Sequence, residues 1–127
     1  MKFDLENLNP GTWFDFEDGG RICLHSLSIE EATAISKKTT NIRVEYKQGQ
    51  RFTIDVIDED KAFSLMWDAV IVGWEGIESA DGKALECTTE NKIKLMKKSP
   101  VFARIVRCFL EKLGEIETTE KEAEEKN

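Results

Sequence analysis

The sequence predicts an α+β domain with N-terminal antiparallel β-hairpins and a short helix, packed against a central apolar helix and two C-terminal helices. Three patterns in the 127 residues predict this class. Apolar and polar residues alternate in two pairs of short runs before residue 57, as they do in half-buried strands. Apolar residues recur at spacings of three and four between residues 58 and 77, and again after residue 100, which indicates helices. We assign residues 1–114 to one domain and residues 115–127 to an acidic, flexible tail.

The first hairpin and the first helix have clear local signals. Residues 12–16 and 21–27 read as two strands, and the turn between them, with Gly19 and Gly20, supplies the backbone freedom of a tight hairpin. Ser28 and Glu31 form a capping box, so a short helix should follow as far as residue 38. We expect that helix to bury three apolar side chains, Ile29, Ala32 and Ile35.

A second hairpin follows in residues 42–46 and 52–56. In each run the apolar residues alternate with charged or polar ones, and Gly49 lies in the loop between them. We therefore predict one wet face and one dry face, with the dry face packed over a helix.

Residues 58–77 form the predicted centre of the fold. Three carboxylates open the stretch, where they favour the exposed N–H groups of a helix start. The helix should be apolar around most of its circumference and end between Val72 and Trp74, because Gly73 and Gly76 weaken it. A loop with an Asp81-Gly82 turn follows.

Two helices complete the predicted domain. Thr88 or Thr89 can cap a short helix that runs to residue 97. The Ser99-Pro100 pair begins a second helix, because Pro is tolerated at the first helical position. One stripe of the second helix carries its apolar side chains, Phe102, Ile105, Val106, Phe109 and Leu113.

Composition restricts the class of partner. The net charge is −7 and the sequence pI is about 4.8. An acidic chain repels phosphate backbones and anionic lipid surfaces, so we expect neither nucleic acid nor a membrane as partner. The N-terminus lacks the apolar core of a signal peptide, and no apolar run could span a bilayer. Three widely spaced cysteines indicate reduced thiols rather than a disulfide framework.

The chemistry-bearing residues do not form a convincing reaction centre. Cys23 and His25, the only histidine, would share a strand face and could form a Cys-x-His metal pair. No matching ligand pair occurs elsewhere, so an inward Cys and an edge His fit the pattern better. The carboxylates of residues 55–60 lack the spacing of a calcium loop. Lysines 92, 94, 97 and 98 read as a solvated face without stacking aromatics. We predict no catalytic residue, no cofactor and no metal, and hence no enzyme.

The region between residues 67 and 111 resembles a known family. Trp74-Glu75-Gly76-Ile77 follows an apolar helix, and the stretch from Asp81-Gly82 to Cys87-Thr88 leads into Glu90-Asn91-Lys92 and then Ser99-Pro100. This layout is similar to that of the tail assembly chaperones of long-tailed bacteriophages and prophages. Gly11-Thr12-Trp13 before an Asp-Gly hairpin also looks like related phage proteins.

The resemblance implies a non-catalytic role in building the tail. Such chaperones bind the tape-measure protein and/or tail subunits such as the major tail protein, act in the host cytoplasm, and are absent from the mature virion. The resemblance, together with large apolar residues in the loops and last helix, makes four residues candidates for partner contact: Trp74, Ile77, Phe102 and Phe109. The oligomeric state stays open.

Two other functions remain as alternatives. One is a structural tail-completion or connector protein of a phage or prophage, which would be found in the mature virion. The other is a small enzyme or metal protein centred on Cys23 and His25.

Overall fold

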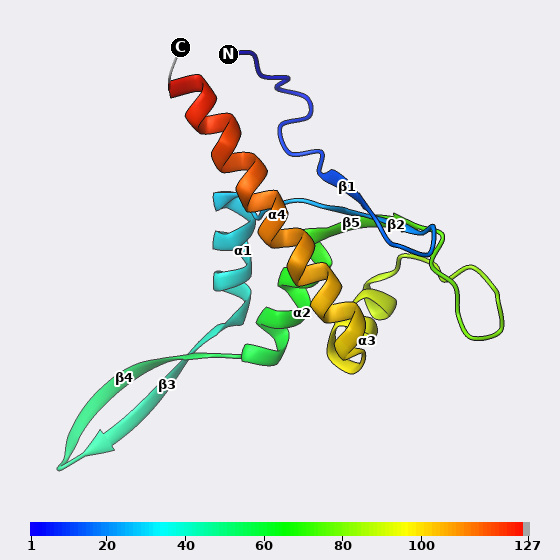
Figure 1. The fold of residues 1–127 in the computed structure, drawn as a ribbon. Coiled ribbons are helices and arrows are strands. Elements are labelled where there is room, and N and C mark those ends of the chain that lie inside the picture. The colour runs from blue at the N-terminus through cyan, green and yellow to red at the C-terminus, as the bar shows by residue number, and fades with distance from the viewer. Residues whose placement is uncertain (126–127) are drawn as a thin grey trace.

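The computed structural model describes residues 1–125, with side chains described as far as residue 119. It confirms the α+β class, with antiparallel strands in the N-terminal half and helices at the C-terminus (Figure 1). The elements are, in chain order, β1 (Thr12–Asp15), β2 (Arg21–Leu24), α1 (Ile29–Thr39), β3 (Thr40–Lys47), β4 (Gln50–Ile57), α2 (Glu59–Val70), β5 (Ile71–Glu75), α3 (Thr89–Lys98) and α4 (Pro100–Glu125).

A three-stranded antiparallel sheet has the order β1-β2-β5. The first hairpin, β1 with β2, is confirmed. The predicted end of the central helix is wrong, because the chain leaves the helix at Val70 and continues directly as strand β5. The β-branched pair Ile71-Val72 and Gly73 all favour leaving a helix. Strand β2 supplies the free edge, and Ile22 pairs with Trp74 across it.

The core lies between this sheet and the helices α2, α3 and α4. Ile22 and Leu24 of β2 and Ile71 of β5 are fully buried. From the helices, the buried side chains are Trp67, Val70, Met96, Ala103, Val106, Phe109 and Leu113. Each large side chain buried in this way contributes about 1.5–3 kcal/mol, so the helix stripes contribute substantially to stability.

Helix α1 begins as predicted but packs less. The Ser28 hydroxyl accepts from the Glu31 N–H at 3.1 Å, and the Glu31 carboxylate accepts from the Ser28 N–H at 3.1 Å, so the capping box is confirmed. The expected burial of Ile29 and Ala32 is wrong, since Ile29 is 88% exposed and Ala32 is also exposed. Ile29 is the first residue of the helix, and its side chain lies in solvent.

Strands β3 and β4 form a two-stranded arm that projects from the body (Figure 1). A two-residue turn joins them, and both of its residues, Gln48 (φ 51°) and Gly49 (φ 76°), have the positive φ of a type I′ turn. This turn places Ile42 opposite Asp55 and Tyr46 opposite Arg51.

The register of the arm contradicts the predicted single dry face. Directly opposed residues lie on the same face, so the apolar row of β3 and the apolar row of β4 lie on opposite faces. Each strand alternates as predicted, but the turn length sets the two alternations out of phase. The arm also does not lie over a helix. Its exposed large apolar residues are Ile42, Val44, Tyr46, Phe52 and Ile57.

The base of the arm is closed. Thr40 pairs with Ile57, and the Asp58 N–H donates to the Thr39 carbonyl at 2.7 Å. The Asp58 carboxylate then caps α2 by accepting from the Lys61 N–H at 3.1 Å. Both ends of the arm therefore meet at one point of the body.

The C-terminal helices begin where the sequence predicts. Thr88 caps α3, and Ser99 precedes α4. Helix α4 is longer than the stripe predicts and continues to Glu125, while residues 126–127 of the predicted tail lie outside the described part of the chain. None of the helices described has the length and apolar content needed to cross a membrane.

Candidate functional site

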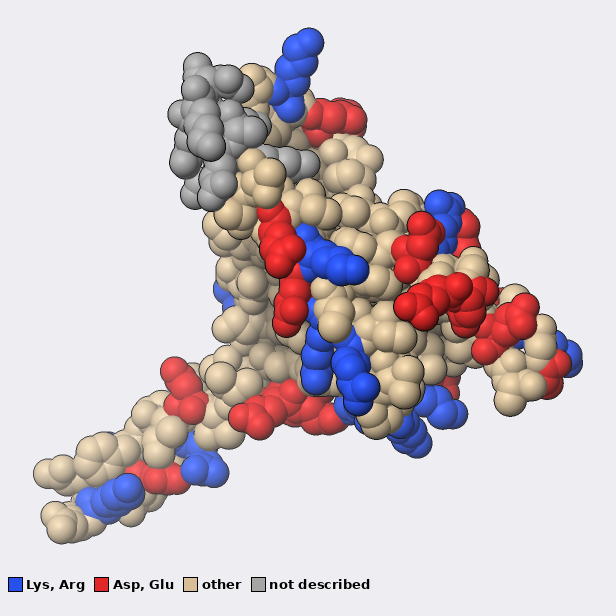
Figure 2. Space-filling view, viewed as in Figure 1, with Lys and Arg blue, Asp and Glu red and all other residues tan. Residues whose placement is uncertain are grey.

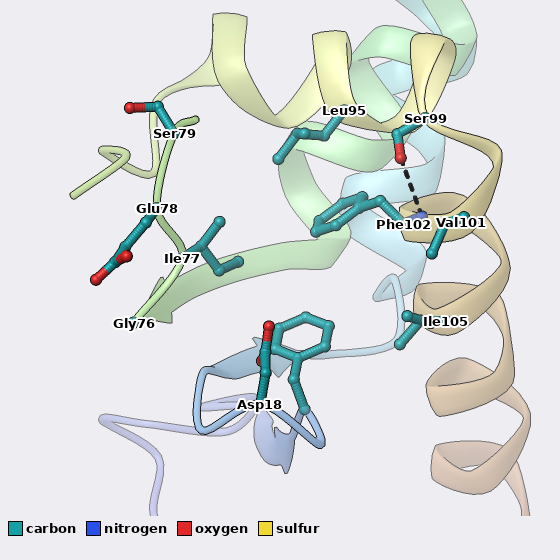
Figure 3. Close-up of a pocket in the computed structure, with 11 residues that line it drawn as sticks. Asp18, Gly76, Ile77, Glu78, Ser79, Leu95, Ser99, Val101, Phe102 and Ile105 are labelled. Carbon is teal, nitrogen blue, oxygen red and sulfur yellow. Dashed lines mark hydrogen bonds between the residues drawn. The ribbon is translucent and has the colours of Figure 1, made fainter. Parts of the chain in front are cut away.

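A surface hollow of about 530 Å³ lies where the loop after β5 faces the α3–α4 junction (Figure 3). We call it the α3–α4 hollow. Its lining residues are Phe16, Asp18, Gly76, Ile77, Glu78, Ser79, Leu95, Ser99, Val101, Phe102 and Ile105.

The start of α4 positions the apolar wall of the hollow. The Ser99 hydroxyl accepts from the Phe102 N–H at 3.2 Å, which satisfies one free donor of the helix end. Phe102 is half-buried and meets the Trp74 ring edge-on, with ring centroids 6.1 Å apart. Val101 is 63% exposed at the rim. The hollow therefore presents an aliphatic and aromatic surface held from behind by the core.

Carboxylates mark the opposite rim. Asp18 comes from the turn of the first hairpin, and Glu78 from the loop after β5 (Figure 3). Figure 2 shows acidic side chains gathered on this side of the molecule, over the end of the three-stranded sheet. A hollow with an apolar wall on one side and carboxylates on the other fits a segment that carries both apolar and basic side chains.

Two glycines bring the acidic rim together. Gly76 has φ +72°, and a Cβ there would lie 3.0 Å from the Gly20 Cα. A Cβ on Gly20 would in turn lie 3.0 Å from the Gly76 carbonyl oxygen. The backbone of the hairpin turn and the backbone after β5 thus approach so closely that any Cβ at either glycine would force them apart. This contact fixes Asp18 and Glu78 on one side of the hollow.

The structure brings two of the four predicted contact residues to this hollow. Ile77 and Phe102 line it from opposite sides. Trp74 is 8% exposed and its indole N–H donates to the Leu85 carbonyl at 2.7 Å, so it packs behind the hollow. Phe109 is also 8% exposed and stacks on Phe14, with centroids 4.9 Å apart. Partner contact by all four stays a prediction, and only Ile77 and Phe102 offer surface for it here.

The sequence did not single out Val101 and Leu95 as contact residues. Val101 follows Pro100 directly, and its apolar side chain lies off the helix stripe. The signal that could have identified Val101 is an apolar side chain at a capped helix start, outside the stripe. Leu95 carried none, because its place in the hollow depends on how α3 packs against α4.

Lys92 is not solvated as the sequence suggested. It is 8% exposed, and its ammonium group donates to the Asp68 carbonyl at 3.1 Å and to the Asp68 carboxylate at 3.2 Å. Thr89 also donates to that carboxylate, at 2.7 Å. These contacts join α3 to α2, which gives the Glu90-Asn91-Lys92 segment a structural role.

Cys23 and His25 both face the segment before β1. The Cys23 thiol lies 3.7 Å from the Pro10 carbonyl, and His25 Nδ1 lies 2.9 Å from the Asn9 carbonyl. His25 Nε2 is 3.3 Å from a Glu31 carboxylate oxygen, without hydrogen-bond geometry. Among the described residues, no cluster of three or more His, Cys, Asp or Glu could hold a metal. Burial raises the pKa of the Cys23 thiol, against a smaller opposing effect of Arg21, which makes the thiol a poorer nucleophile.

Comparison with known proteins places the chain among prophage proteins. Residues 29–127 match the YdaY prophage protein family, from the start of α1 to the C-terminus. The chain belongs to this family. No curated protein and no solved structure matches it.

Proposed function

We propose that the chain is a non-catalytic tail assembly chaperone of a prophage, which binds the tape-measure protein or tail subunits through the α3–α4 hollow. Membership of a prophage protein family supports the setting. The observation that carries the proposal is the hollow itself, where exposed Val101 and half-buried Ile77 and Phe102 stand against two carboxylates. Val101, exposed beside half-buried Ile77 and Phe102, is the apolar surface that a protein partner would bury, and the two carboxylates are the polar rim of such a contact.

The energetics suit a reversible chaperone. A standard interface of roughly 1,600 Å² spans micromolar to picomolar affinities, depending on how well its central contacts pack. A tape-measure helix with its apolar side chains in the hollow could be held at the weak end of that range. It would then be released as tail subunits polymerise around it. On this proposal the protein acts in the host cytoplasm and is absent from the mature virion.

The test is co-expression with the tape-measure protein of the same prophage. We expect the wild-type chain to raise the soluble fraction of the tape-measure protein and to co-purify with it. Val101→Asp should abolish both effects, because it places a carboxylate at the apolar rim. The substitution should not harm folding, since an acid in the first turn of α4 is favourable.

Ile116→Asp is the matched control, on the same helix and 41% exposed but about 22 Å further along. It should behave like the wild type. Equal solubility of the tape-measure protein with and without the chain would refute the proposal. Equal effects of the two substitutions would refute the hollow as its site.

A structural tail-completion or connector protein is the second candidate, and the projecting arm favours it, because such arms suit permanent contacts between subunits. The mature virion distinguishes the two roles. Mass spectrometry of purified particles should find a connector in every virion and a chaperone in none.

A further inference from the structure

The β3–β4 arm lacks the support that an isolated hairpin needs. A two-stranded ribbon is marginally stable in water unless further strands or a helix cover it. Beyond its base, the arm pairs with itself and extends away from the helices (Figure 1). Ile42 and Tyr46 are each 71% exposed on one face, and Phe52 is 43% exposed on the other. Because both faces carry apolar residues, packing against one flat surface would leave the other row in water.

An apolar groove lies at the base of the same arm. It has a volume of about 360 Å³ and lies between α1 and α2. We call it the α1–α2 groove. It is lined by Leu27, Ala32, Ile35, Ile57, Glu59, Ala62, Phe63 and Met66, of which only Glu59 is charged.

From this geometry we propose that two copies of the chain pair through a two-fold axis, with the end of each arm, at Tyr46 and Arg51, against the α1–α2 groove of the other copy. Two arms of equal length laid antiparallel bring each tip to the base of its neighbour. Each arm is about 27 Å long, from eight residues per strand. The contact is therefore self-complementary, as a two-fold interface requires.

The charges at tip and groove are complementary. Residues 40–57 carry a net charge of +1 in a chain of −7, so the rest of the chain carries −8. Tyr46 and Arg51 lie directly opposite each other near the tip. Figure 2 shows acidic side chains where the arm joins the body, and Glu59 lines the groove itself. Among the described residues, neither Arg51 nor Glu59 belongs to an ion pair, so each is available to the other copy.

The area is sufficient for a stable dimer. One large aromatic side chain buries about 150–250 Å², so the two aromatic residues of an arm, together with Ile42 and Val44, offer on the order of 400 Å². Each copy contributes both an arm and a groove, which brings the buried area to about the 800 Å² per partner of a standard interface. None of the residues involved lines the α3–α4 hollow, so dimerisation is independent of the proposed chaperone function.

Sedimentation equilibrium of the full chain tests the proposal by charge reversal. We expect the wild type to be a dimer at micromolar concentration. Arg51→Glu and Glu59→Arg should each raise the dimer dissociation constant about tenfold or more, because each reversal acts at two symmetric contacts. The double variant should restore most of the wild-type affinity.

Lys94→Glu and Glu90→Arg are the matched controls. They make the same charge changes at exposed positions of α3, and Glu90, like Glu59, lies in the first turn of a helix. Both should dimerise like the wild type. A monomeric wild type at the highest accessible concentration would overturn the proposal. A dimer that withstands both single reversals, or an arm protected from hydrogen exchange only when a different protein is added, would also overturn it.

Discussion

Removing the Asp68 carboxylate should destabilise the protein far more than removing its partner Lys92. Lys92 is 8% exposed, and Asp68→Ala leaves its ammonium group with the backbone carbonyl of residue 68 as its remaining partner. Breaking a buried ion pair costs about 3–5 kcal/mol. The Asp68 side chain is 35% exposed, so water partly replaces the carboxylate and lowers our expectation to about 2–3 kcal/mol. Lys92→Met keeps the volume and removes the charge, so it should cost about 0–1 kcal/mol.

Urea unfolding followed by tryptophan fluorescence measures these differences, because Trp67 and Trp74 are both buried. The double variant Asp68→Ala/Lys92→Met should be more stable than Asp68→Ala alone. Thr89→Val is the control for the second hydrogen bond to Asp68 and should cost about 1 kcal/mol. If the double variant is no more stable than Asp68→Ala, an unpaired buried ammonium is not the cause and the reasoning is wrong.

Three further predictions concern the body of the fold. Gly82→Ala, at φ +83° in open space, should cost about 1 kcal/mol. Gly76→Ala should cost at least about 1 kcal/mol more by the same urea assay, because its Cβ also meets Gly20, and equal costs would refute that contact. Phe109→Ala should lower the free energy of unfolding by about 3–5 kcal/mol, while a loss below about 1 kcal/mol would contradict its place in the core. The Ser28 N–H lowers the pKa of Glu31, so this carboxylate stabilises the fold above its ordinary pKa of about 4.3 and the contribution is lost as pH falls through the lowered value. Unfolding of Glu31→Gln across that range should depend less on pH than that of the wild type, and identical pH profiles would contradict the shift.

Features set by neighbouring residues could be predicted from the sequence. The capping box at Ser28, the cap at Thr88 and the helix start at Ser99-Pro100 all depend on residues within one helical turn, and all are confirmed. The first hairpin and the apolar stripe of α4 follow from the same local periodicity.

The features that were missed depend on distant partners. The residues before Glu75, from Ile71 to Trp74, are compatible with either a helix or a strand, and pairing with the free edge of β2 decides between them. The pairing of Lys92 with Asp68 joins residues 24 positions apart. In the arm, the alternation within each strand is local and predictable, but the phase between the strands depends on the turn having two residues. The α3–α4 hollow could be predicted only in part. Ile77 lies in the stretch that resembles the chaperone family, and Phe102 lies on the apolar stripe of α4. Nothing in the sequence marks Leu95.

The closed base of the arm separates its length from the stability of the body. The hydrogen bond from the Asp58 N–H to the Thr39 carbonyl, 2.7 Å long, holds the two ends of the arm together. For the stability of the body, the arm is therefore equivalent to a loop whose ends are already joined. Doubling such a loop adds only about 0.6 kcal/mol of closure entropy. Adding or removing residue pairs in β3 and β4 would therefore change the reach of the arm with little effect on the core. The reach of the arm and the stability of the body are therefore separable properties of this chain.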